Sequence, residues 1–225
     1  MKYKIKKGDK MKNIAVVLAG NGVYDGAEIH EATLTLLAIA QQGAAYQCFA
    51  PDVDQAHVVN HISGEEMPET RNVLVEAARI ARGNIKALSE YNAADYDAII
   101  FPGGFGAAKN LCTFAFDGPD CKVNPDVEKA IKATVDAKKP VGALCISPAI
   151  IAKVLGDVTL TIGQDKGTAD ALESLGVTHI NTTHGEIVVD EKYKVITTPC
   201  YMLDATITQI ADGASNVVAK MLEMA

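Results

Sequence analysis

The strongest candidate for chemistry in the sequence is Cys145, which directly follows the apolar run Val141–Leu144 and precedes Ser147-Pro148. A buried strand that turns sharply into a helix exposes the side chain at the turn. It also points the next backbone N–H groups, beginning with that of Ile146, at a bound ligand. Because the positive end of a helix favours a thiolate, the pattern predicts a nucleophilic cysteine with a lowered pKa. An ordinary buried thiol is the alternative, since free cysteine is among the residues most often buried.

Glycines follow a second predicted strand. Pro102-Gly103-Gly104 comes directly after the apolar run Ala98–Phe101, and glycine lets backbone N–H groups approach a ligand closely. Open α/β sheets bind ligands at the carboxyl ends of their strands. The two strand ends together therefore predict an oxyanion hole beside Cys145. A simple tight turn at the glycines is the alternative.

Glu28 and Glu31 are the candidate acids. They lie three residues apart on a helix predicted over residues 27–42, so they share a face near the end of the first strand. A carboxyl held out of water beside a thiol has a raised pKa and can carry a proton to and from a substrate. For either acid, the alternative is that it complements the helix dipole, as acids in a first turn commonly do.

The elements that must position these residues alternate short apolar runs with longer amphipathic stretches from Asn13 onward. This alternation is typical of a parallel sheet with helices on both faces, so the sequence predicts an α/β fold. We expect one domain over residues 13–225 and a flexible basic arm over residues 1–12. Strands are predicted at 14–18, 46–49, 98–101, 141–144 and 159–162, a hairpin at 187–189 and 195–197, and helices at 27–42, 125–137, 168–175 and 205–222.

Composition excludes several classes of function. With 28 acids and 21 bases, the 225-residue chain has a net charge of −7 and offers no field that attracts phosphate backbones, so no nucleic-acid partner is expected. The longest apolar stretch, residues 141–151, is shorter than the roughly 20 residues that cross a bilayer, and we expect no membrane partner. The five cysteines include no C-x-x-C pair, and no H-E-x-x-H motif is present. We therefore expect free thiols in a reducing compartment, the cytoplasm, and no metal.

Longer strings around these residues resemble a known family. They are residues 22–31 (GVYDGAEIHE), 69–74 (ETRNVL), 101–110 (FPGGFGAAKN) and 197–199 (TTP). These strings look like those of the ElbB glyoxalase family, and the resemblance covers nearly the whole chain from Asn13. That family is a branch of the class I glutamine amidotransferase-like superfamily, alongside the PfpI-type proteases and the Parkinsonism-associated protein deglycases.

The resemblance implies a flavodoxin-like sandwich, a homodimer, a small aldehyde substrate, and a reactive cysteine that maps onto Cys145. The implied reaction requires no cofactor and no metal. The superfamily's helix glutamate maps onto Glu31, which leaves Glu28 as a second residue lining the pocket. The positions that match the family's oxyanion-type site are Gly103, Gly104 and the backbone of Ile146.

The sequence departs from the superfamily in its histidines. Several relatives carry a histidine partner directly after the cysteine, where this chain has Ile146. His179 lies nearer to the place of a downstream histidine in other relatives, and we take it as a candidate third catalytic residue. His184-Gly185-Glu186 spells the H-x-E of glutamine amidotransferases, but it precedes the predicted hairpin, so we interpret it as a coincidence.

The resemblance, together with these residues, implies a cofactor-independent glyoxalase that converts glyoxal to glycolate through a hemithioacetal on Cys145. Apparent protein deglycase activity would follow from free aldehyde released by adducts. The alternative is a redox-sensing or chaperone-like dimer in which Cys145 is oxidised and little substrate turns over. A glutaminase subunit is a third hypothesis. It is weakened because no ready-made catalytic triad of cysteine, histidine and acid is present. The sequence leaves open the roles of Arg71 and Asn110, and whether Cys112 approaches Cys121.

Overall fold

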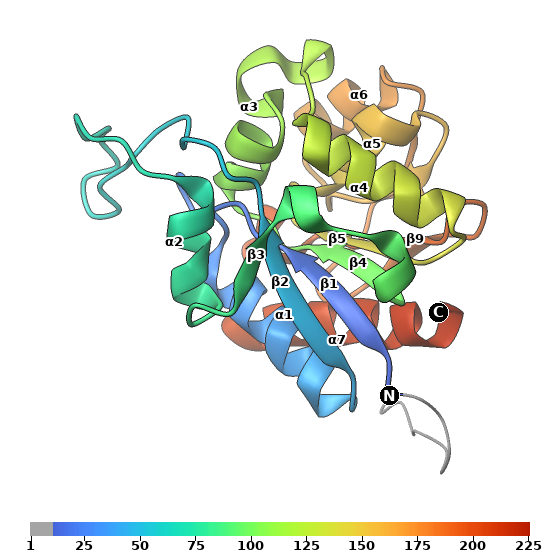
Figure 1. The fold of residues 1–225 in the computed structure, drawn as a ribbon. Coiled ribbons are helices and arrows are strands. Elements are labelled where there is room, and N and C mark those ends of the chain that lie inside the picture. Colours follow the sequence, from blue (N-terminus) through green and yellow to red (C-terminus); the bar gives the residue numbers. More distant parts are fainter. Residues whose placement is uncertain (1–10) are drawn as a thin grey trace.

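The computed structural model describes residues 11–225, so the basic arm predicted over residues 1–12 lies outside the described residues except at its last two positions. There the Lys12 Nζ donates to the backbone oxygen of Ala225 at 2.7 Å. The start of the described chain therefore lies at the end of the last helix (Figure 1).

The strands are β1 Asn13–Val17, β2 Ala45–Ala50, β3 Ile85–Ala87, β4 Ala98–Phe101, β5 Val141–Leu144, β6 Thr159–Leu160, β7 Thr178–His179, β8 Val188–Asp190 and β9 Val195–Thr198. The α-helices are α1 Ile29–Gln41, α2 Val73–Ile80, α3 Phe114–Asp117, α4 Pro125–Asp136, α5 Pro148–Leu155, α6 Lys166–Glu173 and α7 Ile207–Met224. A π-helix spans Ala107–Leu111, and a short 3-10 helix spans Cys200–Met202.

Seven strands form one sheet in the order β3-β2-β1-β4-β5-β9-β8. Neighbouring strands are parallel, except that β8 pairs antiparallel with β9. The direction of winding reverses between β1 and β4, and a crevice for ligands is expected at the carboxyl ends beside such a point. The predicted α/β fold of the flavodoxin-like type is confirmed. β4 also lies next to β5, so the glycine turn and the cysteine turn meet at one edge of the sheet.

Helices cover both faces of the sheet (Figure 1). On one face α1 and α7 lie side by side, with Ile39 of α1 and Val217 of α7 fully buried. On the other face α4 and α5 bury Ile131 and Ile150. Because both sides of the sheet are covered, a central strand such as β4 is apolar at every position, which is why its sequence shows no alternation.

Local sequence explains where the helices begin. The Asn124 side chain accepts from the Asp126 N–H at 2.9 Å, and Pro125 occupies the first position of α4, where its missing N–H costs no hydrogen bond. Thr206 begins α7 with a capping box to Gln209.

The fold differs from the sequence expectations in several short elements. The segment predicted as a strand over residues 159–162 is shorter, and it pairs as β6 with β7 in a separate two-stranded sheet. Helix α2 and strand β3 were not predicted, because both are short and the exposed segment 51–72 that precedes them shows no clear period.

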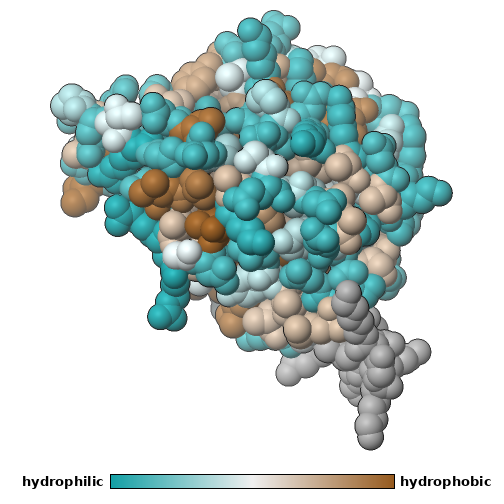
Figure 2. Space-filling model, in the orientation of Figure 1, coloured by the Kyte–Doolittle hydropathy of each residue, from teal (hydrophilic) through white to brown (hydrophobic). Residues whose placement is uncertain are grey.

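The face of the molecule in Figure 2 is mainly hydrophilic, with hydrophobic side chains gathered in the region of α2. In the part of the chain that the structure describes, no helix combines the length and the apolar composition needed to cross a membrane.

Candidate active site

Cys145 occupies the sharp turn between β5 and α5. Its φ of 60° lies in the left-handed region, which a residue other than glycine adopts only where its surroundings impose it. Here the Cys145 N–H extends the parallel pairing of β5 with β9 by donating to the Thr198 carbonyl at 3.0 Å. Helix α5 then begins at Pro148. The structure therefore contains the elbow that the sequence predicts, and Cys145 is only 7% exposed at its apex.

The Glu31 carboxylate is fully buried where three chain segments meet. Its Oε2 accepts from the Gly103 N–H at 2.9 Å, and its Oε1 accepts from the Tyr201 N–H at 3.2 Å. Glu28 is the N-cap of α1 and accepts from the Glu31 N–H at 2.6 Å. The carboxylate also hydrogen-bonds the Cys145 thiol. The structure thus brings Cys145, Glu31 and Glu28 together.

Burial controls the ionisation of the pair. Removal from water, opposed by the N–H donors and reinforced by the charge on Glu28, raises the pKa of Glu31 to about 7. The Cys145 pKa is raised well above its ordinary value, first by burial and then by the charge on Glu31. The predicted lowering of the Cys145 pKa by the helix N-terminus is therefore wrong, because desolvation and the adjacent carboxylate outweigh the helix dipole. Near neutral pH the sulfur keeps its proton while Glu31 is about half ionised.

The glycine turn after β4 closes over this pair. A Cβ on Gly103 would overlap the Cys145 Cβ and lie 2.6 Å from the Glu31 Oε2, so this position has no room for a side chain. The backbone N–H groups of Gly104 and Ile146 donate to the Cys145 sulfur. The Gly103 N–H departs from its predicted oxyanion role, because it is already bonded to Glu31. The donors directed at the sulfur are those of Gly104 and Ile146.

Two residues that sequence reasoning did not select, Cys200 and Tyr201, also border the site. Cys200 has a φ of 43°, and its pKa is raised by burial and then by the charges of Glu31 and Cys145. The Tyr201 hydroxyl hydrogen-bonds His30 Nδ1 at 2.8 Å, and its pKa is raised by burial and by the neighbouring glutamates. A signal for both was present, since they directly follow the TTP string at the end of β9, the strand beside β5.

His179 does not join the site in this structure. It lies on β7, in the separate two-stranded sheet, where its Nε2 accepts from the Ile162 N–H at 3.2 Å. Burial lowers its pKa. Within residues 11–225, no hydrogen bond or ion pair links it to Cys145 or Glu31. Across the same residues, no cluster of three His, Cys, Asp or Glu side chains is arranged to hold a metal ion.

Asn110 has a supporting role that its sequence position did not reveal. It lies on the π-helix that follows the glycine turn, and its Nδ2 donates to the Ala19 and Asp25 carbonyls at 2.9 Å each. Its Oδ1 accepts from the Ala56 N–H at 2.9 Å. A single buried amide therefore holds together the loop after β1, the segment after β2 and the π-helix beside Gly104.

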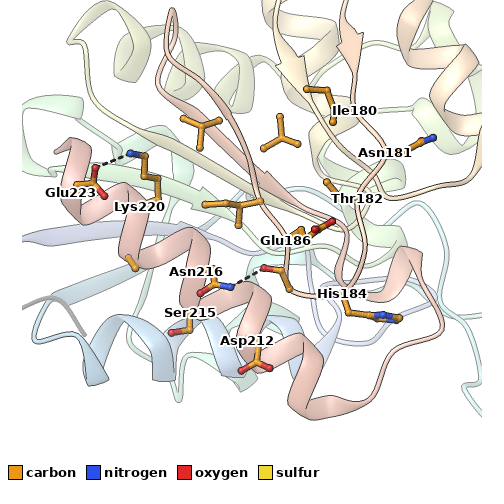
Figure 3. A pocket seen from close by; sticks show the side chains of 15 residues that line it. Ile180, Asn181, Thr182, His184, Glu186, Asp212, Ser215, Asn216, Lys220 and Glu223 are labelled. Carbon is orange, nitrogen blue, oxygen red and sulfur yellow. Dashed lines mark hydrogen bonds and ion pairs between the residues drawn. The ribbon is translucent and has the colours of Figure 1, made fainter. Parts of the chain in front are cut away.

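Arg71 and His184 make contacts of other kinds. Arg71 Nη2 pairs with Glu69 Oε1 at 2.9 Å. His184 Nε2 hydrogen-bonds the Asp204 backbone oxygen at 2.9 Å. His184 also borders a groove of about 1400 Å³ between β8 and α7, across which Asn216 Nδ2 donates to the Gly185 carbonyl (Figure 3). None of the residues around the Cys145 sulfur lines this groove, so the groove and the thiol site are separate features.

Comparison with known proteins places this site in context. No family model matches the chain. Over 221 residues it is 49% identical to the rat protein named ES1 protein homolog, mitochondrial, covering 94% of this chain and 83% of that protein. It is also 49% identical over 221 residues to human glutamine amidotransferase-like class 1 domain-containing protein 3, mitochondrial, covering 94% and 82%.

Solved structures share the fold. An isoprenoid biosynthesis protein with an amidotransferase-like domain from Ehrlichia chaffeensis has a TM-score of 0.89 and 34% identity, covering 95% of this chain and 99% of that one. Glyoxalase III from Candida albicans has a TM-score of 0.62 and 17% identity, covering 95% and 97%. At that identity the second likeness concerns the fold alone.

The relatives also correct one expectation. The cytoplasmic location expected from the free thiols is contradicted, because the rat and human relatives are both named as mitochondrial proteins. All five cysteines are free in the structure. Free thiols report reducing conditions, which do not single out one compartment.

Proposed function

Because the chain belongs to the family of ES1 and class I glutamine amidotransferase-like proteins, we propose that it is a cofactor-independent glyoxalase acting on small α-oxoaldehydes. The superfamily part of the expected resemblance is confirmed by these relatives, and the ElbB branch belongs to the proposal. The observation that carries the proposal is the buried pair of the Cys145 thiol and the Glu31 carboxyl, whose pKa of about 7 suits proton transfer at neutral pH. The fold shared with glyoxalase III adds support.

The first step is addition of the thiol to one carbonyl of glyoxal. Ionised Glu31 takes the proton from the Cys145 sulfur as the sulfur forms a bond to the carbonyl carbon. The electron pair of the C=O bond moves to oxygen. The N–H groups of Gly104 and Ile146 face the sulfur in the free protein, and they turn to this oxyanion and stabilise it once the sulfur is bonded to carbon. Protonation of the oxygen by Glu31 gives a neutral hemithioacetal.

The second step is an internal rearrangement. Glu31 removes the hydrogen from the carbon bonded to sulfur, and the electron pair passes to the neighbouring aldehyde oxygen to form an enediolate. The near hydroxyl proton moves to that oxygen, Glu31 returns its proton to the far carbon, and the product is a thioester that carries a hydroxymethyl group. Water then hydrolyses the thioester, releasing glycolate and restoring the Cys145 thiol. One water is consumed, and no electrons leave the substrate.

The raised pKa values fit this cycle better than the redox-sensing alternative. A carboxyl that serves in turn as base and acid works best when its pKa lies near the working pH, as that of Glu31 does. A peroxide sensor instead needs a stable thiolate, because peroxide reacts with the thiolate and not with the protonated thiol. The Cys145 pKa is raised, so a stable thiolate is disfavoured in the free protein.

The direct test is glycolate formation from glyoxal in an amine-free buffer, since amines form adducts that mimic turnover. We expect the unaltered chain to form glycolate, and Cys145→Ala and Glu31→Gln to form none. Cys48→Ala is the matched control, because Cys48 is also a buried thiol with a pKa raised by burial, but it lies on β2. Its activity should equal that of the unaltered chain.

The pH profile gives a second readout. The free protein needs ionised Glu31 to accept the thiol proton, so kcat/KM should rise with pH and level off above about 7. Apparent deglycase activity, if it arises from released aldehyde, should disappear in the same two variants. An inert unaltered chain with a native circular dichroism spectrum would overturn the proposal, as would full activity in Cys145→Ala.

A further inference from the structure

Cys112 and Cys121 close a surface loop outside the Cys145 site. Cys112 is paired with Val123 in an antiparallel bridge, and the Thr113 N–H donates to the Lys122 carbonyl at 2.9 Å. In extended chain, alternate side chains share a face, so Cys121, two residues before Val123, lies on the same side as Cys112. The two side chains are diagonal cross-strand neighbours, and they lie close enough for each thiol to shift the pKa of the other. This answers the question that the sequence left open.

Both thiols lie directly under the surface. Cys112 is 2% and Cys121 is 1% exposed, yet Asp120 and Lys122 on either side of Cys121 are exposed. The loop between the cysteines contains Gly118, where a Cβ would meet no atom within 4 Å. Because both sulfurs are buried, reaction with a small solute requires a local movement of this loop that exposes the Cys121 sulfur.

The surroundings assign different roles to the two sulfurs. The pKa of Cys121 is lowered, first by its interaction with the Cys112 side chain and also by the charge of Lys153. The Lys153 Nζ is held at the loop by donating to the Pro119 carbonyl at 2.9 Å. The Cys112 pKa is raised, first by its interaction with Cys121 and then by burial. Cys121 is therefore the nucleophile of the pair, and Cys112 keeps its proton.

We propose that Cys112 and Cys121 form a peroxide-reactive dithiol that closes to an intramolecular disulfide. The Cys121 thiolate attacks one oxygen of hydrogen peroxide and breaks the O–O bond. With one proton this yields the Cys121 sulfenic acid and water. The Cys112 sulfur then attacks the Cys121 sulfur, its proton leaves with the hydroxyl as a second water, and the S–S bond forms. Two thiols are oxidised and one peroxide is reduced to two waters.

The disulfide would also alter a contact next to the candidate active site. In the reduced protein the Cys112 thiol donates to the Ala107 carbonyl at 3.4 Å, at the start of the π-helix. A disulfide sulfur has no proton to donate, so this hydrogen bond is lost on oxidation. The same π-helix carries Asn110, which holds the loop after β1.

The sequence makes the test simple. Cleavage after Lys109 and Lys122 releases one peptide, residues 110–122, that contains Cys112 and Cys121 and no other cysteine. The protein is treated with hydrogen peroxide, denatured, alkylated, digested and weighed. We expect this peptide to carry two alkyl labels before treatment, and afterwards none, with the loss of two hydrogens. Reduction before alkylation should restore both labels. The reaction should slow as the pH is lowered, because protonation depletes the Cys121 thiolate.

Two comparisons make the outcome decisive. Cys48, whose pKa burial raises to about 11, should keep its label in the same sample. In Cys112→Ser the peptide should instead trap a sulfenic acid at Cys121 with a dimedone-type reagent. Two labels retained on the unaltered peptide, under peroxide that fully oxidises free glutathione, would overturn the proposal. Disulfides from Cys121 to cysteines other than Cys112 would also overturn it.

Discussion

Glu31 should make the protein less stable as the pH rises towards neutrality. A carboxyl whose pKa is raised on folding holds its proton more tightly in the folded state than in the unfolded state. Stability is therefore lost between the ordinary pKa of 4.5 and the folded pKa of about 7, and the loss is complete above that value. Glu31→Gln removes this titration, so the unfolding free energies of the two proteins should diverge over this range.

The magnitude follows from the size of the shift. Moving from 4.5 to about 7 corresponds to about 3.5 kcal/mol at roughly 1.4 kcal/mol per pKa unit. About 2.5 kcal/mol of this falls between about pH 5 and pH 8.5. The glutamine also changes the hydrogen bonds to the Gly103 and Tyr201 N–H groups. That change shifts the variant by the same amount at every pH, and it cancels when the two pH values are compared.

The assay is urea unfolding of the unaltered chain and Glu31→Gln at both pH values, with Glu173→Gln as the control on an exposed helix position. The measured quantity is the difference in unfolding free energy between the unaltered chain and Glu31→Gln. Between the lower and the higher pH it should change by about 2.5 kcal/mol, with the unaltered chain losing stability. The Glu173→Gln curve should run parallel to that of the unaltered chain. If the curve of Glu31→Gln does so as well, the Glu31 pKa is not raised and the argument for its dual role as acid and base fails.

Three further substitutions test separate parts of the structure. Gly103→Ala should abolish glycolate formation and destabilise the fold by about 1–3 kcal/mol in urea unfolding, because the new methyl overlaps Cys145. Normal activity in this variant would contradict the geometry. Asn110→Ala should lower the free energy of unfolding by about 2–3 kcal/mol and lower kcat/KM, because three backbone groups lose their partner. An unchanged urea midpoint would count against this role. Tyr91→Phe should lower the free energy of unfolding by about 1 kcal/mol, because it removes the buried hydrogen bond to Thr134, and it should leave activity unchanged. A loss of activity would show that this hydrogen bond is coupled to the Cys145 site.

The sequence was sufficient for the parts of the site that sit on regular strands. The runs 98–101 and 141–144 are apolar at every position, and both are strands with those bounds. Because parallel strands end at the same edge of a sheet, Cys145 and the glycines could be brought together without coordinates. Glu28 and Glu31 could both be placed near the strand ends from the predicted helix, and the family resemblance selected Glu31. The raised pKa of Glu31 followed from a carboxyl buried beside a thiol.

What the sequence could not supply depends on competing contacts in three dimensions. Which acceptor the Gly103 N–H takes depends on where the Glu31 side chain ends. The sign of the Cys145 pKa shift depends on whether burial or the helix dipole dominates, and burial is known only from the folded structure. His179 was placed by a loose match, and the chain folds that segment into a separate small sheet.

The Glu31 carboxylate also bears on how the chain folds. Its two backbone partners lie 72 and 170 residues further along the sequence, so neither bond can form before the distant segments have met. Contacts that close such long loops come late and slowly, whereas helices such as α1 form locally. On dilution from denaturant, far-UV ellipticity should therefore return before the thiol chemistry does, and the lag between the two reports the assembly of the sheet edge around a single side chain.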